Sequence, residues 1–284
     1  MTSTTRLTTI ASIYDKRAPT YDSEGGFHAH QASDFLQWMN LTAGLCVLDL
    51  ACGTGPITIP AAKAVGSSGK VIGIDISGDS LIIAREKARK EGLENVEFYL
   101  HDIAALEGLQ GKGVEEASFD IIACASALPL IESPGTAVKS WAKFLKLGGK
   151  LIFDVPTYNA LIGGWVMNLA FQKLGIAMAY NWNNEKALEN IKKMLKGAGL
   201  DDRETFVTES YDGAVIEVKS AGELFEKTVG KEWYDGIYSK LTEPGRKEEA
   251  KKLFCGEVER LAGEDREVME DRRFAIAIGK RVGE

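Results

Sequence analysis

The sequence predicts an α/β protein with a doubly wound, mostly parallel sheet and a helical insertion before the last strand. Apolar runs of strand length alternate with helical segments through the first half of the chain, and these runs are apolar almost throughout. Alternation is typical of βαβ units, and continuous apolar runs are typical of strands that helices cover on both faces. The 284 residues can form one large domain with an added subdomain.

The first half of the chain contains five predicted strands. The first, residues 46–50, runs into a glycine turn and then into a helix that starts near Pro56. A helix over residues 78–92 follows the second strand and ends at a glycine, as a C-cap would. The helix before the fifth strand is expected to stop at Gly148 and Gly149. The other four strands are residues 70–76, 96–102, 119–128 and 150–156.

The second half of the chain loses this regular alternation. Its most apolar stretch, residues 161–180, is long enough to raise the question of a membrane span. Polar side chains in its middle, among them Asn168 and Lys173, favour a buried or lid helix instead. The elements expected after it are a helix with an asparagine N-cap (183–200), a polar strand (203–211) and a last strand (272–281).

Residues 218–270 lie between the last two of these strands and are helical, charged and rich in aromatic side chains. Since a tight hairpin needs only about two to five residues, we expect this insertion to act as a lid over the carboxyl edge of the sheet. Four aromatic side chains of the second half either line an apolar substrate pocket or belong to the core: Trp165, Trp182, Trp233 and Tyr234. The predicted parts are an N-terminal helical segment covering the ligand (1–44), an α/β domain binding it (45–217 and 271–284) and the lid (218–270).

Composition excludes several classes of protein. The 45% apolar and 26% charged residues are those of a folded globular protein, and a net charge of -7 disfavours nucleic acid as a partner. The four cysteines lack the clustered spacing of a metal site, so we expect no metal and reduced thiols in a cytoplasmic protein. The N-terminus lacks the apolar core of a secretory signal. Composition leaves the oligomeric state open.

The stretch VLDLACGTGPITI (47–59) is a strand that enters a glycine turn and then a helix. Such turns let the backbone approach a ligand closely. The dinucleotide fingerprint would need a third glycine where Thr58 stands, after Gly53 and Gly55. A carboxylate at Asp49 disfavours a pyrophosphate but suits a cationic ammonium. The loop therefore predicts a ligand with an ammonium group.

Polar residues also stand at the ends of the next three strands. Ligands of open α/β sheets bind beyond the carboxyl ends of the strands, where Asp75, Asp102 and Ser126 are expected. The carboxylate of Asp75 can accept both hydroxyls of a ribose, and that of Asp102 can accept from the amine of adenine. A ligand with adenine, ribose and an ammonium but no phosphate is S-adenosylmethionine, which these residues predict as the cofactor.

Five segments together resemble the class I S-adenosylmethionine-dependent methyltransferases, in particular the small-molecule branch typified by the ubiquinone/menaquinone-biosynthesis enzymes. The resemblance covers roughly residues 10–156 and the last strand, and it implies a seven-stranded, Rossmann-like methyltransferase fold. The segments are VLDLACGTG (47–55), VIGIDIS (71–77), VEFYLHDIAAL (96–106), FDIIACASAL (119–128) and LKLGGKLIFDVP (145–156).

The resemblance implies roles for the residues at the strand ends. The methionine part of the cofactor would be lined by four residues of the first loop, namely Asp49, Ala51, Cys52 and Gly53. Asp75 would hold the ribose, with Ile76 packed on the adenine. Asp102 and Ile103 would contact the adenine amine and ring, and Ser126 would lie near the sulfonium and the acceptor.

The segment before the sheet also resembles that of the family, in which a tyrosine folds over the cofactor. Here this is Tyr14 or Tyr21, unless that side chain packs under the first helix. His28 and His30 are the candidate general bases, although a lone histidine is more often a surface or cap residue. Many relatives carry a histidine or another polar residue where Pro129 stands, so any catalytic group from that position is absent.

The sequence thus predicts methyl transfer to O, N, S or C of a small organic molecule, mainly through positioning. A general base is needed only if the proton of the acceptor must leave early. Two alternatives stay open: a cyclase or isomerase that binds S-adenosylmethionine without transferring its methyl group, and a non-catalytic partner module.

Overall fold

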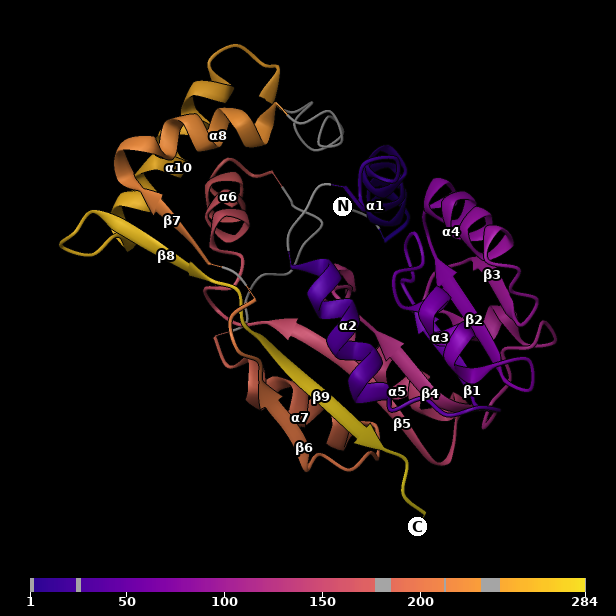
Figure 1. Cartoon of the computed structure of the whole chain (residues 1–284). Coiled ribbons are helices and arrows are strands. Elements are labelled where there is room, and N and C mark those ends of the chain that lie inside the picture. Colours follow the sequence, from indigo (N-terminus) through magenta and orange to yellow (C-terminus); the bar gives the residue numbers. More distant parts are fainter. Residues whose placement is uncertain (1–2, 24–26, 177–184, 212, 231–240, 284) are drawn as a thin grey trace.

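The computed structural model describes residues 3–23, 27–176, 185–211, 213–230 and 241–283, which form a large sheet, a two-stranded sheet and the surrounding helices (Figure 1). The large sheet has seven strands in the order β3-β2-β1-β4-β5-β9-β6. Its strands are β1 (Cys46–Leu50), β2 (Lys70–Asp75), β3 (Val96–Leu100), β4 (Phe119–Cys124), β5 (Leu145–Pro156), β6 (Glu204–Val207) and β9 (Phe274–Lys280). The first five run parallel and β9 runs antiparallel to both neighbours, which confirms the predicted fold class.

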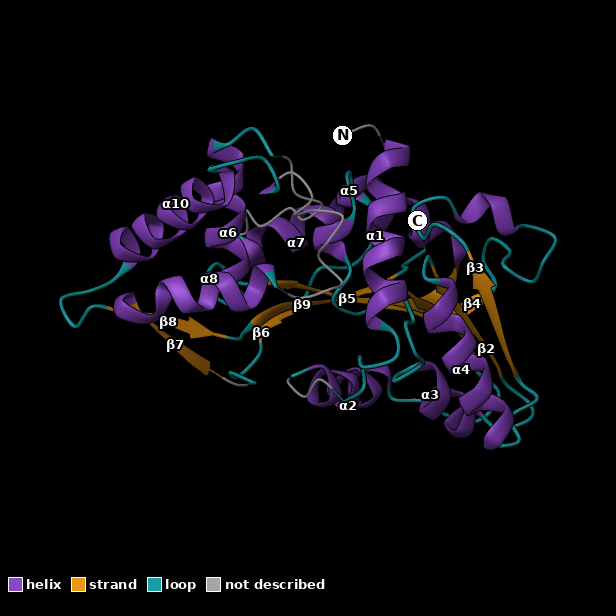
Figure 2. Cartoon of the chain, turned by 90° about the horizontal axis from the view of Figure 1, so that it is seen from above, coloured by secondary structure: helices purple, strands orange, loops and turns teal. Residues whose placement is uncertain are grey.

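Helices cover both faces of this sheet. On one face lie α2 (His28–Met39) and α3 (Thr58–Val65), and on the other lie α5 (Pro134–Phe144) and α7 (Ala187–Gly197) (Figure 2). On β1, Val47 packs with the first pair of helices and Leu48 with the second. Because neighbouring side chains of a strand point to opposite faces, a strand buried on both sides must be apolar throughout.

Several predicted boundaries move in the structure. Helix α5 ends at Phe144, before the predicted stop at Gly148 and Gly149, because β5 begins at Leu145 and pairs there with Phe119 of β4. The two glycines lie inside β5 instead. A Cβ at Gly149 would come within 2.9 Å of the Phe119 carbonyl oxygen, so close strand packing explains that glycine.

The ends of β3 and β4 also come earlier than predicted, at Leu100 and Cys124, so that Asp102 and Ser126 lie in the loops that follow. Helix α4 (Gly78–Lys90) matches its prediction, with Ser77 as an N-cap whose hydroxyl accepts from the Ser80 N–H. The asparagine N-cap predicted at 183–184 lies outside the described residues.

A second apolar cluster lies beside the large sheet. Its most buried aromatic side chains are Phe171, Phe225 and Phe254, and Ile13 of the N-terminal helix α1 (Ser3–Arg17) joins them. The elements of this second unit are α6 (Ile162–Lys173), β7 (Gly213–Glu217), α8 (Ala221–Val229), α10 (Arg246–Leu261) and β8 (Glu267–Asp271). Strands β7 and β8 pair with each other, not with the large sheet. No helix in the described part of the chain is long and apolar enough to cross a membrane.

Candidate functional site

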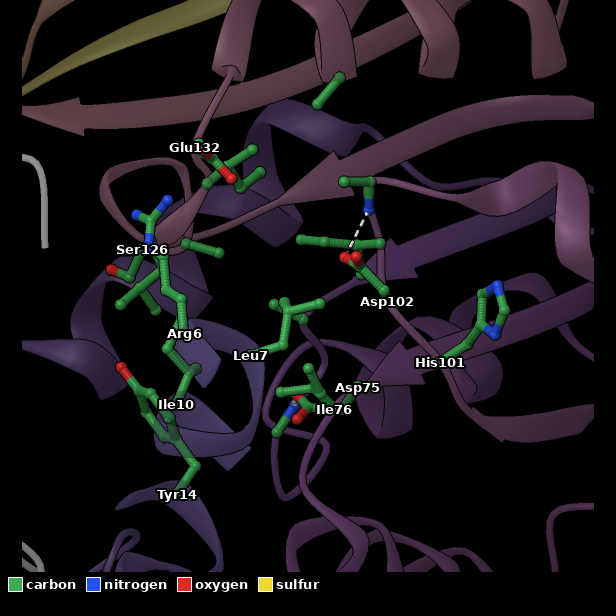
Figure 3. A pocket seen from close by; sticks show the side chains of 18 of the residues that line it. Arg6, Leu7, Ile10, Tyr14, Asp75, Ile76, His101, Asp102, Ser126 and Glu132 are labelled. Carbon is green, nitrogen blue, oxygen red and sulfur yellow. Dashed lines mark hydrogen bonds between the residues drawn. The ribbon is translucent and has the colours of Figure 1, made fainter. Parts of the chain in front are cut away.

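A cavity of about 290 Å³ lies at the carboxyl ends of β1 to β4, where the strand order reverses (Figure 3). Helix α1 supplies the opposite wall. A second cavity of about 50 Å³ adjoins the first. The residues that line both are Tyr21, Ala51, Gly53, Ala125 and Ser126.

The loop after β1 turns through left-handed backbone conformations. Gly53 and Gly55 have φ values of 54° and 90°, and Ala51 has 59°. A Cβ on Gly53 would meet nothing within 4 Å, so this glycine serves the backbone conformation and leaves the cavity open beside it. The structure brings Ala51 and Gly53 to both cavities, and Cys52, whose pKa is raised by burial, to the smaller one.

Asp49 is 2% exposed and lines the smaller cavity. Burial raises its pKa to about 7, although a hydrogen bond donated by the Thr58 hydroxyl works in the opposite direction. Thr58, which stands in place of a third glycine, is therefore the partner of this carboxyl group. A cation placed beside Asp49 would favour its ionised form.

Asp75 is 7% exposed and is held by two backbone groups. Its oxygens accept from the Gly53 N–H at 2.7 Å and from the Ser77 N–H at 2.8 Å, and burial raises its pKa. The backbone of Ile76 also interacts with this carboxylate and lowers its pKa. Because a carboxylate has about four acceptor sites, these contacts still leave acceptor capacity for a ligand. Asp75 and its neighbour Ile76 line the larger cavity, where a vicinal diol fits these acceptor sites.

The loop after β3 forms a further wall of the larger cavity. Asp102 accepts from the Ala104 N–H at 2.9 Å (Figure 3). The next residue, Ile103, lines the same cavity. The Ile103 carbonyl accepts from the indole N–H of Trp141 on α5 at 2.6 Å. The core helix therefore holds this loop in position. His101, at the rim, bonds to the Ala105 carbonyl at 2.8 Å.

Helix α1 contributes residues that the sequence analysis did not single out. Leu7 and Ile10 line the larger cavity from the same helix face as the predicted Tyr14, and Arg6 lies near Glu132 of the opposite loop. The sequence signal for these residues was their spacing of three to four positions, which places their side chains on one face of a helix. Asp15 attaches α1 to the sheet by accepting from the Ser77 hydroxyl at 2.8 Å.

Both candidate tyrosines line the larger cavity, with ring centroids 6.5 Å apart. His28 lines the smaller cavity and stacks on Tyr21 at 5.5 Å. His30 is exposed and is not among the residues lining either cavity.

Gln31 and Asp154 are buried polar residues that the sequence analysis also missed. Asp154 accepts from the Ser126 N–H at 2.6 Å and from the Gln31 amide at 3.0 Å. The Ser126 hydroxyl donates to the Gln31 carbonyl oxygen at 2.6 Å. Burial raises the pKa of Asp154 to about 7. The sequence signal for Asp154 was a carboxyl group in the otherwise apolar run LIFDVP (151–156).

The predicted aromatic lining has a mixed outcome. Trp165 packs against Tyr158 at 5.0 Å and joins the apolar cluster of the second unit. The other three, Trp182, Trp233 and Tyr234, lie outside the described residues. Among the described residues, no group of three His, Cys, Asp or Glu side chains is placed to hold a metal ion.

Comparisons with known proteins show the family of the chain. A family model described as a methyltransferase domain matches residues 41–210. The demethylmenaquinone methyltransferase of Oceanobacillus iheyensis is 30% identical over an alignment of 224 residues, which covers 72% of this chain and 89% of that protein.

Two solved structures share the fold. Phosphoethanolamine N-methyltransferase 2 of Haemonchus contortus, solved with S-adenosylhomocysteine, has a TM-score of 0.54 and 17% identity, covering 89% of this chain and 53% of that one. The cyclase SpnF has a TM-score of 0.59 and 18% identity, covering 96% of each chain.

Proposed function

The chain belongs to the methyltransferase domain family and is an S-adenosylmethionine-dependent methyltransferase, and from this premise we propose that it methylates a small hydroxyl-bearing aromatic molecule. The observation that carries the proposal is the site after β4, where polar Ser126 adjoins an apolar wall formed by Ile10, Leu130 and Ile131. An aromatic ring with hydroxyl groups matches both surfaces. The 30% identity to a demethylmenaquinone methyltransferase supports the same class of substrate.

The described residues fit S-adenosylmethionine, which supplies an electrophilic methyl group when bound. In the proposal Asp75 holds the ribose with the acceptor capacity that its backbone contacts leave, and Ile76 packs on the adenine. Asp102 and Ile103 lie at the adenine amine and ring. The buried Asp49 faces the ammonium group, with Ala51, Cys52 and Gly53 beside it.

The proposed catalysis is mainly positioning, because a bound acceptor held close to the methyl group reacts without a large rearrangement. Tyr14 and Tyr21 cover the cofactor from the N-terminal segment (1–44), which α1 anchors through Asp15. His28 is the proposed proton acceptor if an early loss of the proton is needed, since it lines the smaller cavity. We also assign the role of a lid to the insertion 218–270. We assign a cytoplasmic location to the protein, because its four cysteines are free thiols.

The test of the proposed function is product analysis with a 2-prenyl-1,4-naphthohydroquinone as the probe. The ring carbon forms a bond to the methyl group, the bond from that methyl to sulfur breaks, and the ring proton leaves to water or His28. We expect methylated product and S-adenosylhomocysteine in equal amounts. Consumption of the probe without S-adenosylhomocysteine would point to cyclase or isomerase chemistry and would contradict the proposal. Transfer only to an aliphatic amine would contradict the substrate class.

Binding of the cofactor product is expected to release a proton from Asp49 at pH 6. The free carboxyl group has a pKa raised to about 7, so it is mostly protonated at pH 6, and an ammonium beside it favours ionisation. The affinity should therefore fall as the pH drops below about 7. Calorimetry of S-adenosylhomocysteine binding in two buffers of different ionisation enthalpy measures the released protons.

Asp49→Asn should reduce this proton release and weaken binding by roughly tenfold or more, since a hydrogen bond to a charged group contributes about 1.5–3 kcal/mol. The matched control is Asp79→Asn, because Asp79 is exposed at the start of α4. Equal proton release by the wild type and Asp49→Asn would show that the ammonium does not lie at this carboxylate.

A further inference from the structure

Three groups from distant parts of the chain form a closed ring of hydrogen bonds beside the two cavities. Ser126 lines both cavities, and Gln31 lines the smaller one. Gln31 lies on α2, Ser126 lies after β4, and Asp154 lies on β5. The Asp154 carboxylate accepts from the Gln31 amide nitrogen and from the Ser126 N–H, and the Ser126 hydroxyl donates to the Gln31 carbonyl oxygen. Each of these donors is therefore matched to one acceptor.

This ring determines how the Ser126 hydroxyl meets a ligand. Its hydrogen is committed to Gln31, so its oxygen has only lone pairs left for the cavities that Ser126 lines. The backbone of Ser126 has a left-handed φ of 55°, which is unusual for serine, and the bond from its N–H to Asp154 holds it there. The orientation of the Gln31 amide follows from Asp154, because the amide nitrogen must face the carboxylate.

We propose that Gln31 and Asp154 are positioning residues that fix the Ser126 hydroxyl as a hydrogen-bond acceptor, so that the site selects substrates that donate an O–H or N–H. The inference rests on the proposed function and names the recognition group for its substrate. Asp154 is fully buried and lines neither cavity, so it works through Ser126 and Gln31. Gln31 lines the smaller cavity, and its proposed role is to hold the Ser126 hydroxyl.

The polarity of the ring depends on the proton of Asp154. When Asp154 is protonated, its O–H faces the Gln31 amide nitrogen, and two donors then oppose each other. The Gln31 side-chain amide therefore turns over, so that its carbonyl oxygen accepts from the Asp154 O–H. The amide nitrogen then donates to the Ser126 oxygen, and the hydroxyl hydrogen of Ser126 becomes free to point into the cavity. The site thus offers an acceptor above the pKa of Asp154, which is about 7, and a donor below it.

Among the described residues, two other titratable groups face Asp154, and neither changes its own protonation near neutral pH. Cys124 on β4 and Tyr211, in the segment after β6, are the groups whose pKa values the Asp154 charge raises. Tyr211 also interacts with Asp34 on α2, which raises its pKa further. Because burial raises both pKa values as well, the thiol and the phenol stay neutral across pH 5.5–8.5. Of these three groups, Asp154 is the one that titrates near neutrality.

Asp49, whose pKa burial also raises to about 7, lines the smaller cavity with Gln31 and Ser126, and the ammonium of bound S-adenosylhomocysteine favours its ionised form. Asp49→Asn should therefore keep a midpoint that Asp154 causes.

The first test uses the protein with S-adenosylhomocysteine and needs no substrate. NMR shifts of the Gln31 side-chain amide and the Ser126 backbone N–H are followed from pH 5.5 to 8.5. We expect both to change with one midpoint near pH 7. Asp154→Asn should remove the change, since an asparagine accepts from the Ser126 N–H and donates to the turned Gln31 at every pH. Shifts in the wild type that do not change with pH would overturn the inference.

The second test measures kcat/KM for the hydroquinone probe as a function of pH. The dimethyl ether of the probe, which has no O–H to donate, is added as a competing ligand. The preference is the ratio of the affinity for the hydroquinone to that for the ether. The wild type should prefer the hydroquinone above pH 7 and lose roughly tenfold in this preference below it, as expected for one hydrogen bond. Asp154→Asn should show the low-pH preference throughout. A wild-type preference in Asp154→Asn at pH 8 would overturn the positioning role.

Two further variants separate the possible outcomes. Asp120→Asn is the matched control, because Asp120 also accepts from a backbone N–H of a neighbouring strand, at Cys46, but lies at the opposite end of β4. It should keep the wild-type pH profile. Gln31→Leu should abolish the pH dependence while S-adenosylhomocysteine still binds. If the probe is not methylated, the proposed function fails, whereas the NMR titration still tests the ring.

Discussion

Asp75→Ala is expected to reduce the affinity for S-adenosylmethionine by a hundredfold or more. The change removes the acceptors for the ribose and also the partners of two backbone groups, the N–H of Gly53 and the N–H of Ser77. Hydrogen bonds to a charged group contribute about 1.5–3 kcal/mol each, and every 1.4 kcal/mol is about tenfold in affinity. Isothermal titration calorimetry with S-adenosylmethionine measures the loss.

Two further variants test the cause of that loss. Asp75→Asn keeps an acceptor oxygen but loses the charge and one backbone bond, so its affinity should lie between those of the wild type and Asp75→Ala. Asp79→Ala, on the exposed side of the same turn, should bind as the wild type does. Full affinity in Asp75→Ala, with the fold intact by circular dichroism, would place the ribose elsewhere.

Trp141→Ala is expected to lower the free energy of unfolding by about 3–5 kcal/mol, as truncation of a large buried aromatic side chain does. Trp141 is fully buried between α5 and the sheet. Its indole N–H also holds the Ile103 carbonyl at 2.6 Å, so the loss reaches the loop that carries Asp102. Urea unfolding measures the stability, and calorimetry measures S-adenosylhomocysteine binding to the folded protein.

Trp141→Phe separates packing from the hydrogen bond. It keeps most of the buried ring but leaves the Ile103 carbonyl without its donor. The free energy of unfolding should therefore fall by about 1–3 kcal/mol, and cofactor binding should weaken. Trp38→Phe is the matched control, since Trp38 packs edge-on against Phe206 and is not among the residues lining the cavities. Unchanged binding in a folded Trp141→Phe would show that the loop after β3 holds its position without this bond.

The large sheet could be predicted because local sequence carries its signals. The alternation of apolar runs and helical segments follows from strands buried on both faces, as Val47 and Leu48 illustrate on β1. The boundary between a helix and a strand was predicted wrongly where the two meet without a loop, as α5 and β5 do. Leu145 joins β5 because Phe119 lies opposite it, and a partner that lies in another part of the chain leaves no trace in the local pattern.

The sequence by itself determined the residues that the proposal places at the cofactor. Asp49, Gly53 and Asp75 lie at strand ends, and parallel strands bring their carboxyl ends to one edge of the sheet, so spacing along the chain was enough to group these residues. Only the tertiary structure brought together the ring of Gln31, Ser126 and Asp154, which the proposal places at the acceptor. Gln31 and Asp154 are 123 residues apart and meet because α2 packs under β5, a contact that arises from folding of the whole chain.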